Sequence, residues 1–574
     1  IDRNALRMEV TDDAARLAAV APLDSDDDGV EDDLDASPLD ASESVDSDGD
    51  GVGDNADAFP LDASEYVDSD GDGVDDSAPD LEVGPDALPL DASESVDSDG
   101  DGVGDSAPDL EVGPLNGDAL PLDANDDQVL ATQFLQTTST SQNITNLHIL
   151  NSAEIAQTFK GTLWDRDGNQ LGSGSVNLGA AVPSTGRLIL SSADLDALFG
   201  EAPWSGPAML QVQGVSSFDL MSKLISPSGL VSNTNCVRED RVLNIEGFES
   251  SNMTYVRLIN TENQDTGEII GTLYDAEGNV VGSANSVLAA NLGPHQQAWI
   301  NRNELANKVG AQWNGESLLE VNQIAGLKLL NLNYITDEKT FFNFSCFEDS
   351  TSGRVYLQTT STSQNVSATH LVNTSDVEQQ FTGTLYGSDG SQVGSANQPL
   401  HSGTIPSKGR IIISSEDIES AFNISPWSGP AMLEVQGTDS FELMTKLTSP
   451  SGLISNTNCV RQDQVHNIGG FDQTDVTYVR FINIGDTPIS NIKGSLYDTS
   501  GNVVGETNPV LIDELPAKAH VWRNRNQLSD LIGDTWNGTA SLKIDNADSN
   551  LRLLNLNFIN SETFFNFSCY ETGQ

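Results

Sequence analysis

The sequence is short of basic residues. Its 574 residues include 26 Lys and Arg against 87 Asp and Glu, which gives a formal net charge of -61. Residues 23–127 contain 37 acidic residues and no Lys or Arg. Binding to nucleic acid or to anionic lipid depends on cationic side chains that neutralise phosphates. The composition therefore argues against nucleic-acid partners.

Cysteine, histidine and long apolar runs are also scarce. Four cysteines, none in a CxxC pair, exclude a disulfide-dense scaffold and give no support to zinc or thioredoxin-like chemistry. The six histidines are scattered, and no HExxH, GxSxG or phosphate-binding loop occurs, so we predict no catalytic site and no enzyme. No stretch approaches the twenty apolar residues of a membrane span. The chain starts at Ile1 without a charged segment and apolar run, and we expect that a signal peptide has been removed.

Aspartate, in contrast, is arranged at regular positions. The phrase Asp-Ser-Asp-Gly-Asp-Gly-Val occurs three times, with one variant, in loops that begin at Asp24, Asp46, Asp68 and Asp97. Carboxylates stand at loop positions one, three, five and nine, and a glycine at position six allows a sharp turn, which is the spacing of a calcium loop. The predicted ligands are Asp24, Asp26, Asp28, Asp32, Asp35, Asp46, Asp48, Asp50, Asp54, Asp57, Asp68, Asp70, Asp72, Asp76, Asp80, Asp97, Asp99, Asp101, Asp105 and Asp109.

The last two loops depart from the pattern at position twelve. Pro79 and Pro108 stand where loops one and two have Asp35 and Asp57, and the neighbouring Asp80 and Asp109 are the predicted substitutes. The linkers carry prolines that block regular helix and sheet, at Pro38, Pro60, Pro89 and Pro121. A segment this acidic and poor in large apolar residues cannot bury a core and would otherwise be disordered. We therefore expect several calcium ions to replace the core.

This segment resembles the thrombospondin type 3 repeats found in many bacterial surface proteins. The resemblance rests on Asp-x-Asp-x-Asp-Gly-x-x-Asp and implies an extended calcium-binding ribbon without helices. The disulfide-forming cysteines of the animal repeats are missing here. An EF-hand or a dockerin fits less well, because no amphipathic helices flank the loops.

The rest of the chain is repetitive. Cysteines and tryptophans recur 223 residues apart, as with Cys236 and Cys459 or Trp204 and Trp427. This 223-residue repeat contains a weaker half-repeat. A hairpin motif occurs twice in each copy, starting at Gly161, Gly271, Gly383 and Gly494. We predict an all-β protein: a leader at 1–22 able to act as a donor strand, the calcium ribbon at 23–127, and four immunoglobulin-like β-sandwiches, forming two duplicated pairs, at 128–240, 241–350, 351–462 and 463–574.

Several residues recur once in each module. The tryptophan of the Trp-(Ser/Asn)-Gly motif could stack on sugars, but its repetition before an alternating strand favours a core position. The repeat favours disulfides Cys236–Cys346 and Cys459–Cys569, which would require two modules to lie side by side; the alternative is four buried thiols. Asn-x-Ser/Thr sequons occur, for example at Asn143, Asn252, Asn365 and Asn566.

These features predict a secreted, extracellular, calcium-stabilised structural protein, the self-associating subunit of a surface fibre. One alternative is a cell-surface adhesin whose modules bind a glycan or a receptor, with the ribbon as a spacer. A weaker alternative is the accessory region of a secreted hydrolase. The leader, as an apolar arm, could pair with a sheet edge of a neighbouring subunit.

Overall fold

The computed structural model divides the chain into two compact units, Ile1–Gln128 and Val129–Gln574. In the first unit it describes residues 37, 42 and 45–47, so the leader and nearly all of the predicted ribbon lie outside the described part. In the second unit the described residues are 129–135, 142–200, 204, 206–227, 231–233, 236–335, 340–345, 348–358, 360–427, 429–450, 454–456, 459–559 and 563–572.

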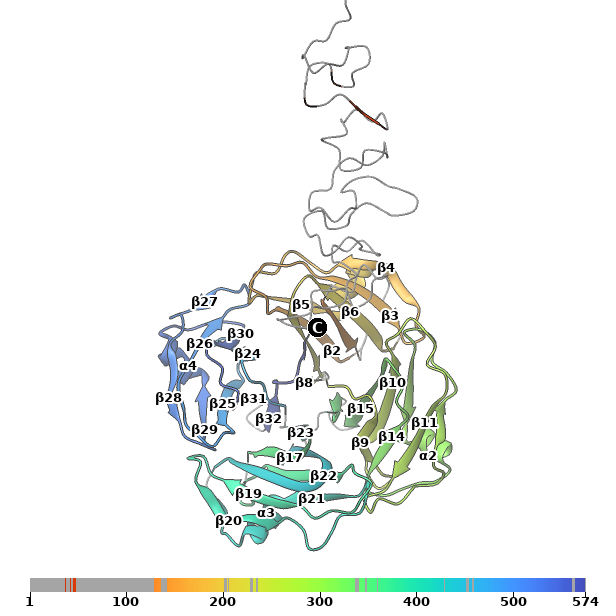
Figure 1. Cartoon of the computed structure of the whole chain (residues 1–574), viewed down its shortest axis with the longest axis vertical. Helices are drawn as coiled ribbons and strands as arrows, with labels where there is room; N and C mark the ends of the chain where they lie inside the picture. The colour runs from red at the N-terminus through yellow and green to blue at the C-terminus, as the bar shows by residue number, and fades with distance from the viewer. Residues whose placement is uncertain are drawn as a thin grey trace, which may run out of the picture. The chain divides into compact units, whose positions relative to one another are not determined.

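The second unit is all-β and consists of four consecutive modules (Figure 1). Module 1 has one short helix and eight strands: β1 (Val129–Leu135), β2 (Ile144–Asn151), β3 (Lys160–Asp165), β4 (Gln170–Asn177), β5 (Arg187–Ser191), α1 (Ser192–Phe199), β6 (Ala208–Gly214), β7 (Phe218–Ile225) and β8 (Val231–Asn233). Module 2 repeats the pattern with β9 (Arg241–Glu246), β10 (Met253–Asn260), β11 (Ile269–Tyr274), β12 (Ser286–Ala289), β13 (Gln297–Asn301), α2 (Arg302–Val309), β14 (Glu316–Val321), β15 (Leu327–Ile335) and β16 (Thr340–Asn343).

The second pair of modules follows the same plan. Module 3 contains β17 (Glu348–Leu357), β18 (Val366–Asn373), β19 (Thr382–Tyr386), β20 (Gln392–Pro399), β21 (Arg410–Ser414), α3 (Ser415–Phe422), β22 (Ala431–Thr448) and β23 (Ile454–Asn456). Module 4 contains β24 (Gln464–Gly469), β25 (Val476–Asn483), β26 (Ile489–Tyr497), β27 (Val503–Val504), β28 (Val510–Leu515), β29 (His520–Asn524), α4 (Arg525–Ile532), β30 (Thr539–Ile544), β31 (Leu551–Ile559) and β32 (Thr563–Asn566), followed by β33 (Glu571–Thr572).

Each module is a sandwich of antiparallel sheets around its own apolar core. In module 2 the two sheets have the orders β13-β10-β15-β16 and β12-β11-β14-β9. This order differs from that of an immunoglobulin domain, in which the first, second, fourth and fifth strands share a sheet. The sandwich prediction is confirmed, but its immunoglobulin-like topology is wrong. Alternation of apolar and polar residues fixes which strand face is buried, and it leaves the order of strands in the sheet open.

The repeated tryptophans lie in these cores. Trp204, Trp313, Trp427 and Trp536 each pack in the core of one module and are 5–8% exposed. The prediction of a core position is confirmed, and sugar stacking by these side chains is excluded in the folded state. The indole nitrogens of Trp313 and Trp536 donate to the carbonyls of Ile245 and Ile468, at 3.4 and 3.2 Å.

The helices are short connectors at the module edges. Each has eight residues, starts with a capping box and ends at a residue in the left-handed conformation. In α2, for example, the side chain of Asn301 accepts from Glu304 N, and the carboxylate of Glu304 accepts from Asn301 N. Caps satisfy the orphan backbone groups that a two-turn helix would otherwise leave unpaired. Within the described residues, no helix is long and apolar enough to cross a membrane.

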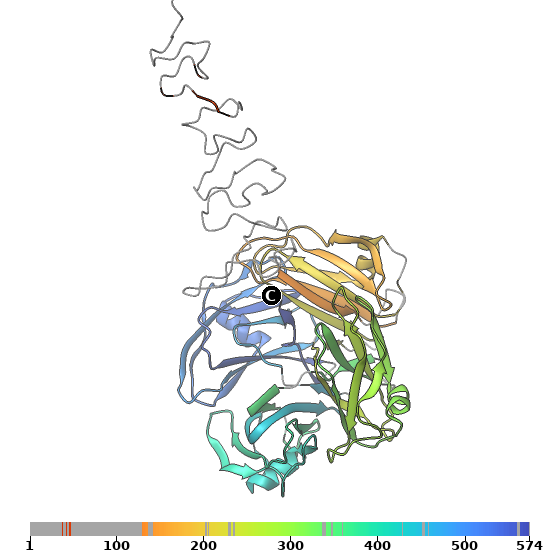
Figure 2. The same cartoon turned by 45° about the vertical axis from the view of Figure 1, so that its right-hand side comes forward.

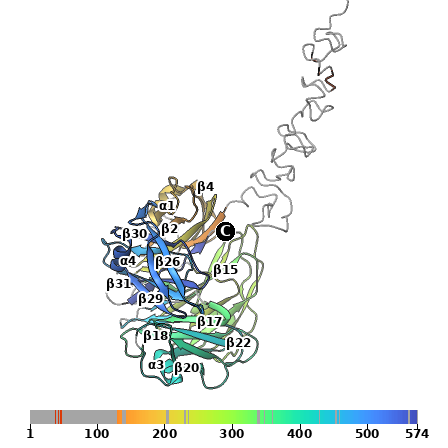
Figure 3. The same ribbon diagram turned by 60° about the vertical axis from the view of Figure 1, so that its left-hand side comes forward.

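The four modules close into a ring (Figures 1, 2 and 3). A hairpin turn of each module contacts the backbone that leads into a strand of the next. The resulting hydrogen bonds run from Gln297 N to Arg166 O, Arg410 N to Ala276 O, His520 N to Ser388 O and Arg187 N to Thr499 O, at 2.8–3.0 Å. The last bond returns from module 4 to module 1. Strand β33 pairs with β7 at the same interface, with Glu571 opposite Leu220.

These turns depend on glycine. Gly278, for instance, has φ +81°, and a Cβ there would collide with the carbonyl oxygen of Ser407 in the next module. Only glycine combines the positive φ with so close an approach of two backbones. The Gly-centred turn that marks every hairpin motif is therefore also the contact point between neighbouring modules.

The centre of the ring is apolar. One cluster there draws on all four modules: Leu150 and Met221, Phe342 and Phe344, Met444, and Phe565, Phe567 and Tyr570. The interfaces 1–2 and 3–4 are apolar as well, with clusters such as Phe134, Trp164, Met209, Ile259, Leu330 and Leu332. The interfaces 1–2 and 3–4 each also hold one fully buried arginine, Arg257 and Arg480, which donates to a carbonyl of the preceding module. The interfaces 2–3 and 4–1 contain clusters of several buried charged and polar residues. Modules therefore pack as two largely apolar pairs, joined by two interfaces that are richer in buried charged and polar groups.

Candidate functional site

The predicted calcium ligands lie almost entirely outside the described residues. Of the twenty aspartates only Asp46 is described, and its side chain is partly buried. The calcium ribbon therefore stays a prediction. The functional geometry that the structure does show is concentrated at the polar interfaces 2–3 and 4–1 and at the ring centre.

At interface 2–3 one carboxylate contacts three basic side chains, a lysine, an arginine and a histidine. Glu316 of module 2 accepts from Lys446 Nζ at 2.6 Å and from Arg410 Nη1 at 2.9 Å, and His370 Nδ1 lies 2.9 Å away. All three partners belong to strands of module 3. A second carboxylate, Glu442, lies 2.6 Å from Arg238 of module 2. Charged hydrogen bonds of this kind fix the mutual orientation of two modules more tightly than apolar contact does.

The cluster shifts the protonation of its own members. Burial by itself would raise the pKa of Glu316, but Lys446, His370 and Arg410 together hold this pKa well below its usual value. Burial, assisted by Lys446, lowers the pKa of His370 to about 4. At neutral pH the cluster therefore contains a carboxylate, a neutral imidazole and two cations.

Interface 4–1 contains a chain of hydrogen bonds between a serine, a histidine and an aspartate. His466 Nε2 lies 3.0 Å from Asp219 Oδ2, and His466 Nδ1 lies 3.2 Å from Ser541 Oγ. These are the residue types of a hydrolase triad. However, Ser541 is 8% exposed, and Arg187 Nη2 donates to its Oγ at 2.7 Å, which lowers its nucleophilicity. Asp219 also accepts from Gln464 and Thr572, so the arrangement holds modules 4 and 1 together.

A disulfide lies at the ring centre. Cys459 and Cys569 are bonded, with their Cα atoms 5.4 Å apart. This is one of the two bonds that the repeat favours, but its geometry differs from the expectation. Arg461 N donates to Leu553 O, so the segment around Cys459 already packs on module 4, and the bond ties the two ends of one module. No folding back of two modules is needed.

The second predicted bond is described at one end. Cys236 is disulfide-bonded, and Cys346 lies outside the described residues. The Sγ atoms of Cys236 and Cys459 are 3.6 Å apart, which brings the segments preceding modules 2 and 4 together.

The recurrent asparagine of each module has a structural role. Asn151, Asn260, Asn373 and Asn483 are buried, and each side-chain amide donates to three backbone carbonyls of the following loops. Among the sequons, Asn566 is 5% exposed and its amide donates to Cys459 O, so the folded chain cannot be glycosylated there. Asn252 is partly exposed.

The burial of the histidines was not predicted from the sequence. Their scatter suggested exposed strand residues without a role, yet His148, His295, His370, His466 and His520 are all buried. His295 stacks on Trp164 across interface 1–2, with the ring centroids 4.1 Å apart. The available signal was the recurrence, 222 or 223 residues apart, of His148 and His370, Arg187 and Arg410, and Lys223 and Lys446 within otherwise apolar strands.

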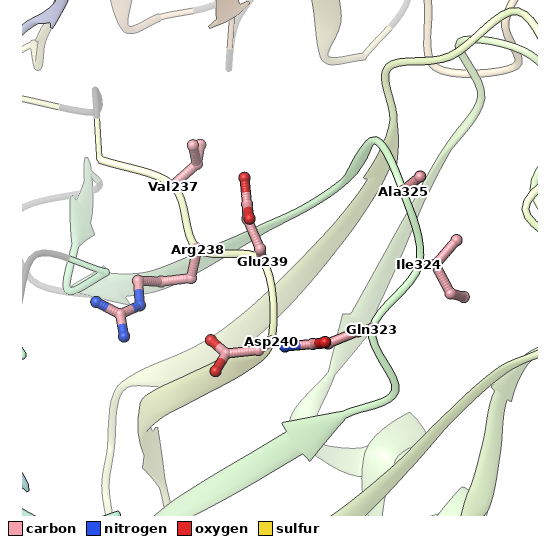
Figure 4. A pocket seen from close by; sticks show the side chains of 7 residues that line it. All are labelled: Val237, Arg238, Glu239, Asp240, Gln323, Ile324 and Ala325. Atoms are coloured by element: carbon pink, nitrogen blue, oxygen red, sulfur yellow. The ribbon is translucent and has the colours of Figure 1, made fainter. Parts of the chain in front are cut away.

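Two cavities occupy repeat-related positions. The first, of about 660 Å³, lies between the segment 237–240 and the loop 323–325 of module 2, with Arg238, Asp240 and Gln323 among its lining residues (Figure 4). The second, of about 560 Å³, is lined by the counterparts Arg461 and Asp463 and by module 1 residues at interface 4–1. Mixed charged and amide groups of this kind suit a polar ligand.

Comparisons with known proteins give little. No protein-family model matches the chain, and no curated protein matches its sequence. Among solved structures, a chain titled "Biofilm associated protein - BSP domain" is 9% identical and is aligned over 78% of this chain and 96% of its own length, with a TM-score of 0.12. At that TM-score the similarity carries no argument about fold or function.

The buried histidines predict a loss of stability in acid. Burial lowers the pKa of His370 to about 4, whereas an unfolded histidine has a pKa of about 6.5. The unfolded chain therefore takes up protons first as the pH falls, and stability that is present above pH 6.5 is lost between about pH 6.5 and 4. We expect the melting temperature to fall across this window, and His370→Gln to reduce the fall. Calorimetric melting at several pH values tests this; coincident pH curves for variant and wild type would show that His370 is not responsible.

Proposed function

We propose that the protein is a non-enzymatic, calcium-stabilised structural protein of the cell surface, the repeating subunit of an extracellular fibre. The ring forms its rigid head, and the aspartate-rich segment binds several calcium ions and sets the reach of the subunit. The observation that carries the proposal is the closed ring joined to a segment with four calcium-loop spacings.

Ring closure bears on how such a fibre grows. The same heterologous contact is used four times, from each module to the next, and the fourth contact closes the set within one chain. A heterologous contact that closes leaves no free copy for further growth. Growth of the fibre then depends on the leader and the ribbon, with the leader at 1–22 as the arm that adds to a sheet edge of the next subunit. Deletion of residues 1–22 should abolish polymerisation, and unchanged fibres would exclude this route.

Calcium removal should expand the ribbon. Folding and metal binding are linked where a segment has no core, so a chelator should increase the radius of gyration and the protease sensitivity of residues 23–127. X-ray scattering of the whole chain with calcium and then with chelator measures the change. Substituting Asp48 and Asp50 by Asn should reproduce part of it in calcium, whereas the exposed Asp513→Asn in β28 should not. Identical dimensions with and without calcium would contradict the stiffening role.

The two repeat-related cavities favour a second candidate, an adhesin whose head binds a glycan. Both contain an Arg and an Asp at matching positions, which could bind sugar hydroxyl groups. Glycan-array binding that is lost in the double variant Asp240→Asn and Asp463→Asn, with an unchanged melting temperature, would support this function. If the wild-type protein binds no glycan on the array, the adhesin function is excluded.

A further inference from the structure

The two polar interfaces are built from the same strands, and a comparison of them reveals a missing partner. Module 3 presents Arg410 on β21 and Lys446 on β22 to module 2, and module 1 presents Arg187 on β5 and Lys223 on β7 to module 4, in each case 223 residues apart. His370 and His148 are also equivalent, since His370 faces Met444 and His148 faces Met221 in the strand register.

The arginine and the lysine each make one hydrogen bond that is the same at both interfaces. Arg410 Nη2 donates to Leu243 O, and Arg187 Nη2 donates to the equivalent carbonyl of His466. Lys446 donates to Asn244, and Lys223 donates to the equivalent Asn467. The cationic side chains of modules 1 and 3 therefore have the same orientation toward their neighbours.

The hydrogen bonds to a carboxylate, which are present at interface 2–3, have no equivalent at interface 4–1. Arg410 Nη1 and Lys446 both donate to Glu316, the first residue of β14. The equivalent first residue of β30 is Thr539, whose side chain has no carboxylate and is two atoms shorter. Among the described residues, Arg187 Nη1 has no hydrogen-bond partner there, whereas Arg410 Nη1 has Glu316. His148 Nδ1 is also buried without a partner, and its counterpart His370 Nδ1 lies 2.9 Å from Glu316 without a well-aligned hydrogen bond. Arg187 and His148 are 8% and 5% exposed, and burial lowers the pKa of Lys223 to about 7, with Arg187 as the second cause.

A buried cation without a counter-ion is costly, because desolvation is not compensated by any opposite charge. Asp219, the counterpart of Glu442, bonds with His466, Gln464, Ser152 and Thr572, and it cannot replace Glu316. The donors at interface 4–1 are therefore equivalent to those that bind the Glu316 carboxylate at interface 2–3, and no described residue supplies an anion to them here.

We propose that interface 4–1 contains a binding site for a small monovalent anion, a carboxylate such as formate or a halide, held by Arg187, Lys223 and His148 in the position that the Glu316 carboxylate occupies at interface 2–3. Guanidinium and ammonium donors form their strongest hydrogen bonds with such anions. The ion completes the contact that closes the ring, so its binding stabilises the closed head. This inference does not depend on the proposed function.

The test compares anions at equal ionic strength on the full chain. We expect the melting temperature in sodium formate or chloride to exceed that in sodium gluconate, whose anion is too large for the site, because ligand binding to the folded state stabilises it. Thr539→Glu supplies the carboxylate internally, so it should raise the melting temperature in gluconate and abolish the difference between salts. Thr539→Gln fills the same volume without charge and should abolish the difference without the rise.

A direct measurement complements the melting data. Crystals soaked in sodium bromide should show an anomalous peak within hydrogen-bonding distance of Arg187, absent from Thr539→Glu. The proposal is overturned if only water occupies the position in formate and in bromide, or if wild type and Thr539→Glu respond to the salts alike.

Discussion

Replacing Glu316 by glutamine should lower the free energy of unfolding of the ring by about 3–5 kcal/mol, the loss typical for removal of one member of a buried ionic cluster. Glu316 is the shared partner of Lys446, Arg410 and His370. Glutamine keeps the size of the side chain and removes the charge, so the two cations remain buried without compensation. Urea-induced unfolding, followed by near-ultraviolet circular dichroism, measures the change.

Glu434→Gln is the matched control. Glu434 also contacts two cations, Arg354 and Lys518, each at 2.9 Å. The two carboxylates are similarly buried, but the side chains of Arg354 and Lys518 are 28% and 13% exposed, against 2% and 7% for Arg410 and Lys446. Solvent screening should limit the loss there to about 1 kcal/mol. Equal losses in the two variants would mean that burial of the cluster does not determine its contribution.

Replacing Cys459 and Cys569 together by serine should lower the free energy of unfolding by about 2–4 kcal/mol. The bond closes a loop with a sequence separation of 110 residues and ties the entry of module 4 to its end. Without it the unfolded chain gains conformational freedom, and the contacts of Arg461 with Ser568 and Tyr570 lose their covalent support.

Urea unfolding of the double variant under oxidising conditions measures this loss. Wild type in dithiothreitol should lose at least as much, because reduction opens the bond of Cys236 as well. A double variant as stable as oxidised wild type would show that the bond contributes nothing to the stability of module 4.

The sandwiches themselves could be predicted because their signals are local. Alternation within strands such as Tyr255 to Ile259, glycine-centred turns and a tryptophan at one position per module indicate short paired strands around a core. The internal repeat then set the number of modules. These patterns depend on residues close together in sequence and on which strand face is buried. Both can be read from a single sequence.

The ring could not be predicted, because its closure rests on contacts between residues far apart in sequence. The bond from Arg187 N to Thr499 O joins the first and the last module of the second unit. The turn around Gly501 looks like any hairpin turn in sequence, and nothing there indicates that module 1 contacts it. The burial of the histidines could not be predicted for the same reason, since burial at an interface depends on which modules are in contact.

The prediction for the disulfide is confirmed for its pairing and wrong for the arrangement of modules. The repeat indicated Cys459 with Cys569, but the expected side-by-side modules followed from placing Cys459 at the end of module 3. The backbone bond from Arg461 to Leu553 places this segment on module 4. A chain segment between two domains has no hydrophobic period of its own, so the sequence does not show which domain it joins.

Electron microscopy of the purified full chain, in calcium and then in chelator, tests the central claim most directly. The proposed function predicts fibres in calcium, with four-module rings as regularly spaced heads, and shortened or dispersed fibres after chelation. Monodisperse single rings in both conditions would contradict the assignment as a calcium-stabilised fibre subunit.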